Sequence, residues 1–191
     1  DIYLFIYLSL IILFFFIFLN FDYNFLLILF SIASSISNIG ISLSNVPNNL
    51  YILFLMLVIV GGSYFSTSSG IRFVKLFALL KFSLNEILSY SKPNYVYTNK
   101  FQLFDTNIDL KDIYKYFLTL IIFVGSFFLL TTLLTISEIN FEDSFKIGIL
   151  TLMNTTTSSM YGLKDFNFYD LNSYTKFILI IFMTIGRFEL I

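Results

Sequence analysis

The sequence contains no cysteine and no histidine. Without cysteine there is no disulfide framework and no thiolate metal site. Without histidine, the commonest general base and the commonest metal ligand are missing. An intramembrane serine protease would need such a base beside its serine. An aspartyl protease would need two aspartates inside membrane spans, and the sequence places none there. We therefore expect no enzymatic activity.

Charge is also scarce. Of the 191 residues 12% are charged and 58% are hydrophobic, and the mean hydropathy is +0.87. A soluble domain carries about 25% charged residues, so we expect a lipid bilayer to surround part of the chain. The net charge of −1 argues against a nucleic-acid partner, because such proteins present concentrated positive charge. The sequence does not begin with Met, from which we expect a fragment of a longer protein.

Apolar segments of two lengths alternate along the chain. Residues 3–19, with their flanks, and residues 114–136 are long enough to cross about 30 Å of hydrocarbon as helices. Residues 25–33 and 145–153 are too short, and each leads into a polar tract rich in Ser, Thr and Asn. Further apolar segments are expected at 50–60, 71–88 and about 171–185. Each half therefore predicts a long span, a half-span, a polar tract and another span, which is an internal repeat.

The polar tracts have a physical meaning at membrane depth. Non-helical backbone is tolerated there only where protein buries it or where it lines a water-filled cavity. Two such tracts at equivalent positions indicate a substrate path between the repeats.

The distribution of charge predicts the orientation. Seven of the 11 basic residues lie in or beside a central polar segment: Arg72, Lys75, Lys81, Lys92, Lys100, Lys111 and Lys115. The positive-inside rule then puts this segment in the cytoplasm and both polar tracts toward the outside. Each short helix would point its carboxyl end into the membrane, and the partial negative charge of that end favours a cation. Backbone carbonyls and hydroxyls in the tracts are groups that can replace water around an alkali ion.

Four segments resemble, in order, motifs of the Trk/Ktr/HKT superfamily of potassium transporters, and the resemblance covers about residues 25–191. They resemble a selectivity filter, a broken helix, the segment that follows it and a closing motif: Ser37-Asn38-Ile39-Gly40-Ile41-Ser42, residues 61–72, Ser91-Lys92-Pro93-Asn94-Tyr95-Val96-Tyr97, and Ile185-Gly186-Arg187-Phe188-Glu189-Leu190.

The resemblance implies an all-α membrane protein with two helix–pore-loop–helix repeats, the carboxyl-terminal half of a TrkH-like membrane subunit with a four-repeat pore. Residues 1–88 would be the third repeat with a broken second helix, 89–112 a cytoplasmic linker, and 113–191 the fourth repeat, truncated at its end. The function implied is potassium uptake across the bacterial inner membrane, with potassium as substrate and no cofactor. The implied partners are the missing amino-terminal half, a second copy in a homodimer and a cytoplasmic ring of nucleotide-binding regulatory subunits.

The resemblance also implies roles for individual residues. The potassium-binding filter would be formed by Ser37, Asn38, Ile39 and Gly40 and by Thr155, Thr156, Thr157 and Ser158. Ser158 stands where the family has a glycine, which leaves the choice between potassium and sodium open. The intramembrane gating loop would contain Gly61, Gly62, Ser66, Thr67, Ser68, Ser69 and Gly70. Arg187 would sit near the gate and compete with permeating cations.

Alternatives stay open for several of these residues. Gly40 alone fits an ordinary turn, residues 61–70 fit a helix-packing face, and Arg187 fits a side chain that reaches the cytoplasmic interface. The remaining charged residues near the second tract are expected to be solvated: Lys146, Lys164, Asp165, Asp170 and Lys176. The alternative function is a structural or proton-pathway subunit of a respiratory complex. That function predicts acids or lysines within continuous spans, and Glu86 is the one acid well inside an apolar helical pattern.

Overall fold

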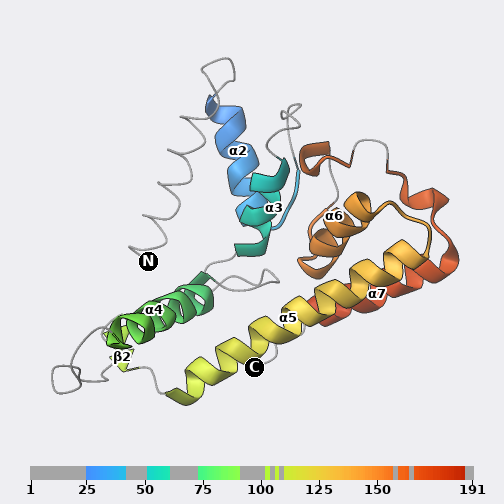
Figure 1. The fold of residues 1–191 in the computed structure, drawn as a ribbon. Coiled ribbons are helices and arrows are strands. Elements are labelled where there is room, and N and C mark those ends of the chain that lie inside the picture. The colour runs from blue at the N-terminus through green and yellow to red at the C-terminus, as the bar shows by residue number, and fades with distance from the viewer. Residues whose placement is uncertain are drawn as a thin grey trace.

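The computed structural model describes residues 25–41, 51–60, 73–90, 102–103, 106–107, 110–156, 159–163 and 166–187. The expected all-α class is confirmed in these residues (Figure 1). The helices are α2 (Phe25–Ile36), α3 (Tyr51–Val60), α4 (Phe73–Tyr90), α5 (Leu110–Ile136), α6 (Phe141–Leu152) and α7 (Ser173–Arg187), with short 3-10 turns η2 (Ser159–Tyr161) and η3 (Phe168–Asp170). Two very short strands, β1 (Gln102–Leu103) and β2 (Thr106–Asn107), pair antiparallel.

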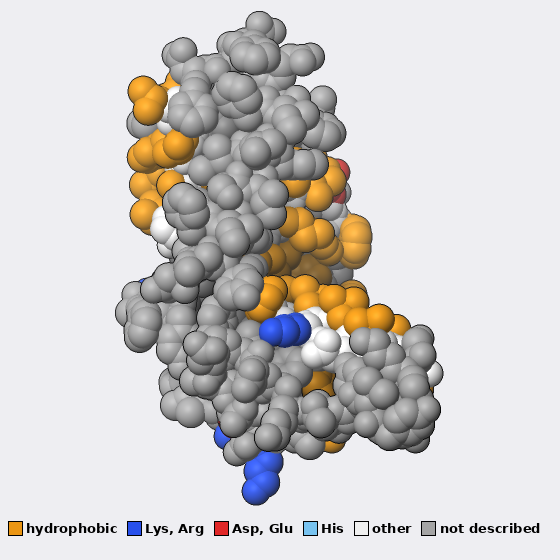
Figure 2. Space-filling model, turned by 90° about the vertical axis from the view of Figure 1, so that its left-hand side faces the viewer, with side chains coloured by type: hydrophobic (Ala, Val, Ile, Leu, Met, Phe, Trp, Pro, Cys, Tyr) orange, Lys and Arg blue, Asp and Glu red, His pale blue; other side chains and the backbone are white. Residues whose placement is uncertain are grey.

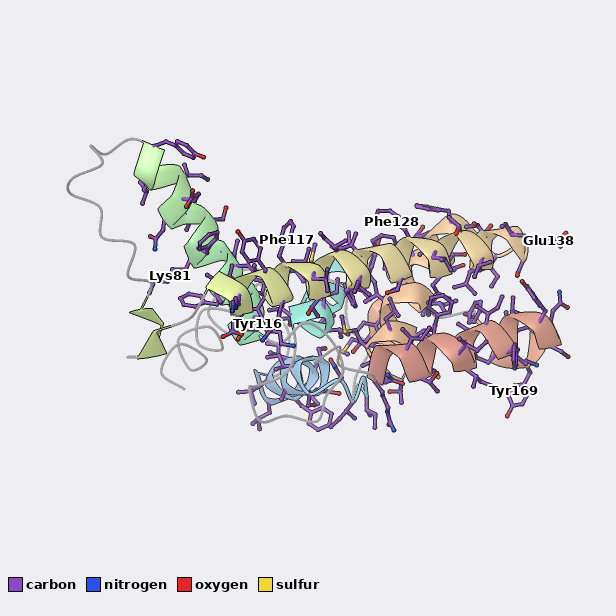
Figure 3. All side chains as sticks on the ribbon, turned by 90° about the horizontal axis from the view of Figure 1, so that it is seen from below. Lys81, Tyr116, Phe117, Phe128, Glu138 and Tyr169 are labelled. Atoms are coloured by element: carbon purple, nitrogen blue, oxygen red, sulfur yellow. The ribbon has the colours of Figure 1, made fainter. Side chains whose placement is uncertain are left out.

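Helix α5 is the longest element. Its 27 residues extend about 40 Å at about 1.5 Å per residue. Among the described residues it is the one helix long and apolar enough to cross a membrane, over Lys111–Ile136, and only 17% of its most apolar stretch is buried. Phe117 and Phe128, for example, are exposed on it (Figure 3). An apolar surface of this size is found where lipid or another protein covers it.

The hydrophobic core surrounds the much shorter helix α6. Every residue from Lys146 to Leu152 is buried, because α3, α5 and α7 all pack against this helix. Glu142 and Asp143 lie in its first turn, where negative charge favours the amino end of a helix. The core side chains that α6 meets come from three helices: Phe54 and Val58, Leu130 and Leu134, and Ile178, Leu179 and Phe182.

Helices α5 and α7 run antiparallel and both pack against α6, and α2 packs against α3 (Figures 1 and 3). Helix α4 contacts α5. The predicted span at 3–19 and the predicted broken helix at 61–72 lie outside the described residues. Helix α5 begins two residues before the expected end of the linker at 112, and α4 continues to Tyr90.

Charged residues lie at opposite ends of α5. Lys81 lies on the side of its amino end, where Lys111 and Lys115 are also found, and Glu138 follows its carboxyl end (Figure 3). On the face shown in Figure 2, the Lys and Arg side chains lie in the lower half, and the visible acidic group lies higher. Basic residues therefore outnumber Asp112 at the amino end of α5, which we call its basic end, and Glu138 follows its carboxyl end, which we call its acidic end.

Candidate functional site

The first polar tract begins where α2 turns back on itself. Helix α2 extends three residues past the apolar segment 25–33, and the Ser35 hydroxyl bonds back to the Ser31 carbonyl oxygen at 2.9 Å inside the helix. Asn38 then adopts φ of +58°, a left-handed conformation that ends many helices. Gly40 follows with φ of +77°, a conformation that glycine adopts at little cost.

One serine holds this tract to the helix. The Ser34 carbonyl oxygen accepts hydrogen bonds from the amides of Ile39 at 3.0 Å and Gly40 at 3.3 Å. Its hydroxyl accepts a third, from the Ile41 amide at 2.8 Å. The Ser37 hydroxyl also donates to the Ser34 carbonyl, at 3.2 Å. The backbone from 37 to 41 is thus fixed against the carboxyl end of α2.

The second tract leaves α6 in the same way. Asn154 has φ of +52°, and the Thr155 amide donates to the Leu150 carbonyl at 2.9 Å, as the Ile39 amide does to Ser34. Both helices have 12 residues, and each left-handed Asn is the second residue after the helix. This common geometry makes Gly40 the counterpart of Thr156. The family motif had instead placed the glycine position at Ser158, which lies outside the described residues.

The two tracts meet, although they are far apart in sequence. The Thr156 hydroxyl donates a hydrogen bond to the Ile39 carbonyl oxygen, across 117 residues. Gly40 lies so close that an added Cβ would be 2.5 Å from the Thr156 carbonyl oxygen and 3.3 Å from the Thr155 methyl. Gly40 and Thr155 are buried, whereas Ile39 and Thr156 are exposed. The structure therefore brings the described residues of the two tracts into direct contact.

Helix α7 is tied to the second tract. The Asn154 side-chain amide donates to the Met183 carbonyl oxygen at 3.0 Å. Gly186 lies directly against the Leu152 backbone, at the carboxyl end of α6. Arg187 follows as the last residue of α7 and is exposed. The structure thus brings the last turn of α7 to the place where the second tract begins.

The other predicted site residues fall outside this geometry. Thr157 and Ser158 of the filter, and Gly61, Gly62, Ser66, Thr67, Ser68, Ser69 and Gly70 of the gating loop, lie outside the described residues. Across the part of the chain that is described, no group of three or more acidic, His or Cys side chains is placed to hold a metal ion.

Lys146 corrects an expectation. It was expected to be solvated, but its side chain is only 5% exposed, since the Tyr51 ring of α3 and the Gly162 backbone lie against it. Its Nζ lies 2.6 Å from the Glu142 carboxylate, and this charged hydrogen bond lowers the pKa of Glu142 from its ordinary value. Spacing alone gave a signal for the pair, because residues four apart share a helix face. Lys176 is exposed, as expected. The expected solvation of Lys164, Asp165 and the Asp170 side chain falls outside the described structure.

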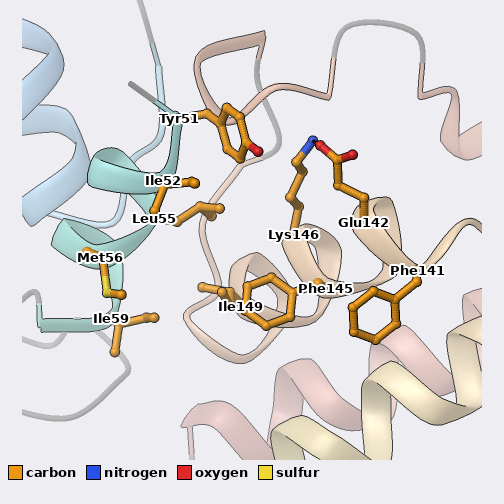
Figure 4. A pocket seen from close by; sticks show the side chains of 10 residues that line it. All are labelled: Tyr51, Ile52, Leu55, Met56, Ile59, Phe141, Glu142, Phe145, Lys146 and Ile149. Atoms are coloured by element: carbon orange, nitrogen blue, oxygen red, sulfur yellow. Dashed lines mark hydrogen bonds and ion pairs between the residues drawn. The ribbon is translucent and has the colours of Figure 1, made fainter. Parts of the chain in front are cut away.

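An open cavity of about 380 Å³ lies beside Lys146, between α3 and α6 (Figure 4). Its walls are almost entirely apolar, and the Lys146–Glu142 pair and Tyr51 lie at one end.

Comparison with known proteins adds no relative. No protein-family model matches the sequence, and no curated protein matches it.

Proposed function

We propose that this chain conducts potassium across a membrane, along a path lined by the two polar tracts. The contact between the tracts carries the proposal. Each tract follows a short helix, each is turned by a left-handed Asn, and Thr156 of one bonds to Ile39 of the other. A binding surface built from two such loops is the arrangement that a path between repeats requires.

The chemistry of the tracts suits a dehydrated alkali ion. Carbonyl and hydroxyl oxygens can replace the water around such an ion without a fixed negative side chain. The carboxyl ends of α2 and α6 lead into the tracts, and each end carries partial negative charge that favours a cation. Potassium would thus be held by the backbone of Ser37, Asn38, Ile39 and Gly40 and of Thr155, Thr156, Thr157 and Ser158.

The membrane setting rests on helix lengths and charge. Helix α5 is long enough to cross, whereas α2 and α6, at 12 residues and about 18 Å each, are not. The basic end of α5 would face the cytoplasm and the acidic end the outside of a bacterial inner membrane. On this proposal two helix–pore-loop–helix repeats form half of the pathway. The missing amino-terminal half would supply the rest, within a homodimer on a regulatory ring.

The proposed gate has two parts, the segment 61–70 and Arg187. Support for Arg187 comes from its neighbour Gly186, which packs on the carboxyl end of α6 and so brings the last turn of α7 near the second tract. A cation at the end of a tightly packed helix is well placed to compete with a permeating cation.

The one described helix long enough to cross a membrane lacks the groups that the respiratory-subunit alternative needs inside a span. A proton pathway needs an acid or a lysine inside a span. Helix α5 carries its charged residues Lys111, Asp112 and Lys115 in its first turns and none from there to its end at Ile136.

The test is potassium-dependent growth and rubidium uptake in a bacterium without its own potassium uptake systems. The complete protein is expressed intact, with Gly40→Ala, or with Gly125→Ala as control. At Gly40 a side chain meets both a left-handed backbone and the Thr156 oxygen, which together cost on the order of 2–4 kcal/mol. At Gly125 an added Cβ has nothing within 4 Å.

We expect the intact protein and Gly125→Ala to restore growth at low potassium. We expect Gly40→Ala to lose more than about tenfold of the rubidium uptake at equal membrane levels, since about 1.4 kcal/mol corresponds to a factor of ten. A well-expressed intact protein that moves neither potassium nor sodium, even with its regulatory subunit, would end the proposal.

A further inference from the structure

Lys146 is a buried charge with a complete set of partners. Its Nζ lies 2.6 Å from the Glu142 carboxylate, 3.3 Å from the Gly162 carbonyl oxygen, and 4.6 Å from the centre of the Tyr51 ring (Figure 4). An ammonium has three donors, and these three partners occupy its surroundings. A buried cation is costly unless it is paired and hydrogen-bonded in this way.

The three partners come from three separate segments. Glu142 lies one turn earlier on α6, Gly162 follows the second tract, and Tyr51 begins α3, the first described helix after the first tract. The Gly162 backbone has φ of +77°, and an added Cβ would be 3.2 Å from Nζ and 3.4 Å from the Tyr51 ring. Gly162 thus lets the backbone approach the ammonium closely. Lys146 therefore connects the elements into which both tracts lead.

The segment 159–163 is held on its other side by burial. Met160 is 2% exposed and Tyr161 is 0% exposed, and both belong to the core. The hydrogen bond from Lys146 to Gly162 fixes the end of this anchored segment. The described residues on either side of 157–158 are therefore both held, Asn154 by α6 and Gly162 by Lys146.

We propose that Lys146 is a positioning residue for ion selection, which fixes the outer end of the second tract by holding segment 159–163 against α3. The proposal rests on the proposed potassium path. Discrimination between potassium and sodium depends on the size of the binding cavity and on the number and field of its oxygen ligands. A backbone released at one end adapts to a smaller ion. Loss of the tether therefore weakens discrimination more than it weakens transport.

The test uses the complete protein with Lys146→Met, Lys146→Arg or Lys115→Met. Lys115→Met is the matched control, because Lys115 is a lysine of the same chain in an ion pair with Asp112 at 2.9 Å, but with its side chain 67% exposed. Two quantities are measured: the hydrogen-exchange rate of the amides in 159–163, and the ratio of rubidium uptake to sodium uptake.

We expect Lys146→Met to raise exchange in 159–163 by about tenfold or more, the effect of losing about 1.4 kcal/mol of local protection. The uptake ratio should fall several-fold. Lys146→Arg, which keeps the charge and the hydrogen-bond donors, should recover part of both, and Lys115→Met should change neither.

Each remaining outcome overturns part of the reasoning. Unchanged exchange in Lys146→Met overturns the tether. Raised exchange with an unchanged uptake ratio leaves a structural contact and overturns the role in ion selection. If Lys146→Met is not recovered in the membrane, Tyr51→Leu replaces it, and an unchanged exchange rate and ratio in that variant overturn the proposal. If the intact protein transports neither ion, the proposed function is wrong, and so is the role of Lys146 in ion selection. The exchange measurement still shows whether Lys146 holds the segment 159–163.

Discussion

Gly125 and Gly186 both lie inside helices, but an added methyl group meets different surroundings at each. On α5, an added Cβ at Gly125 has nothing within 4 Å. Gly125→Ala should therefore gain helix propensity and stabilise the protein by about 0.5–1 kcal/mol. On α7, an added Cβ at Gly186 would overlap the Leu152 carbonyl oxygen and lie 2.9 Å from its carbonyl carbon and 3.1 Å from its Cα. These are backbone atoms, so no side chain can rotate away.

The cost at Gly186 follows from the movement that relieves this overlap. Helix α7 has to move from α6 by on the order of 1 Å, enough to forfeit much of the dispersion energy at the contact. Overpacking of this kind costs about 1–3 kcal/mol. The movement also strains the bond from Asn154 to the Met183 carbonyl oxygen, worth about 0.5–1.5 kcal/mol. After the gain of about 1 kcal/mol in helix propensity, we expect Gly186→Ala to destabilise by about 1–3 kcal/mol.

The assay is thermal unfolding of the complete purified protein in detergent, with both variants beside the intact form. The two substitutions are chemically identical, so their difference isolates the packing of α7 on α6. Gly125→Ala should raise the apparent Tm and Gly186→Ala should lower it, by about 2–4 °C per kcal/mol. A Gly186→Ala protein as stable as the intact form would refute the close approach of α7 to the carboxyl end of α6.

Two smaller effects are expected beside these. Thr156→Val removes the hydroxyl that bonds to the Ile39 carbonyl, so rubidium uptake should fall by about 2- to 10-fold, the effect of one lost hydrogen bond. Thr156→Ser keeps the hydroxyl and should keep the uptake. Equal uptake by both variants would count against the contact between the tracts. The pKa of Glu142 is lowered in the folded protein by its hydrogen bond and charge interaction with Lys146. The ion pair therefore stabilises the fold fully at a pH above the ordinary pKa of 4.5, and this stabilisation is lost as the pH falls through the lower pKa of the folded state. Apparent Tm measured against pH should show an acid-side loss in the intact protein that is smaller in Glu142→Gln, and identical curves would argue against the ion pair.

The helices themselves were largely predictable from the sequence. Runs of apolar residues of different length predicted the long helix α5 and the short helices α2 and α6, because burial and helix length both follow from local composition. The predicted first and last residues of the helices were less accurate. Helix α2 continues to Ile36, three residues past the predicted segment, and α6 begins at Phe141, four residues before the predicted segment.

The contacts of the site were not predictable in the same way. The bond between Thr156 and Ile39 joins residues 117 positions apart, and no local pattern encodes such a pairing. The pairing of Gly40 with Thr156 likewise depends on how each helix ends, which a motif match does not contain. The burial of Lys146 depends on Tyr51 and Gly162, which come from distant segments. The predicted gating loop and the residues Thr157 and Ser158 stay predictions.

Ser34 has a consequence for the sign of the ion that the first tract can accept. The amides of Ile39, Gly40 and Ile41 are three successive donors, and all three donate hydrogen bonds to the carbonyl and hydroxyl oxygens of this one serine. An anion is held by free N–H groups, and in this stretch they are already satisfied. What the stretch still offers is lone pairs, since each carbonyl oxygen has two. On the proposed function, one serine would thereby give a neutral peptide a preference for positive ions, without any acidic side chain.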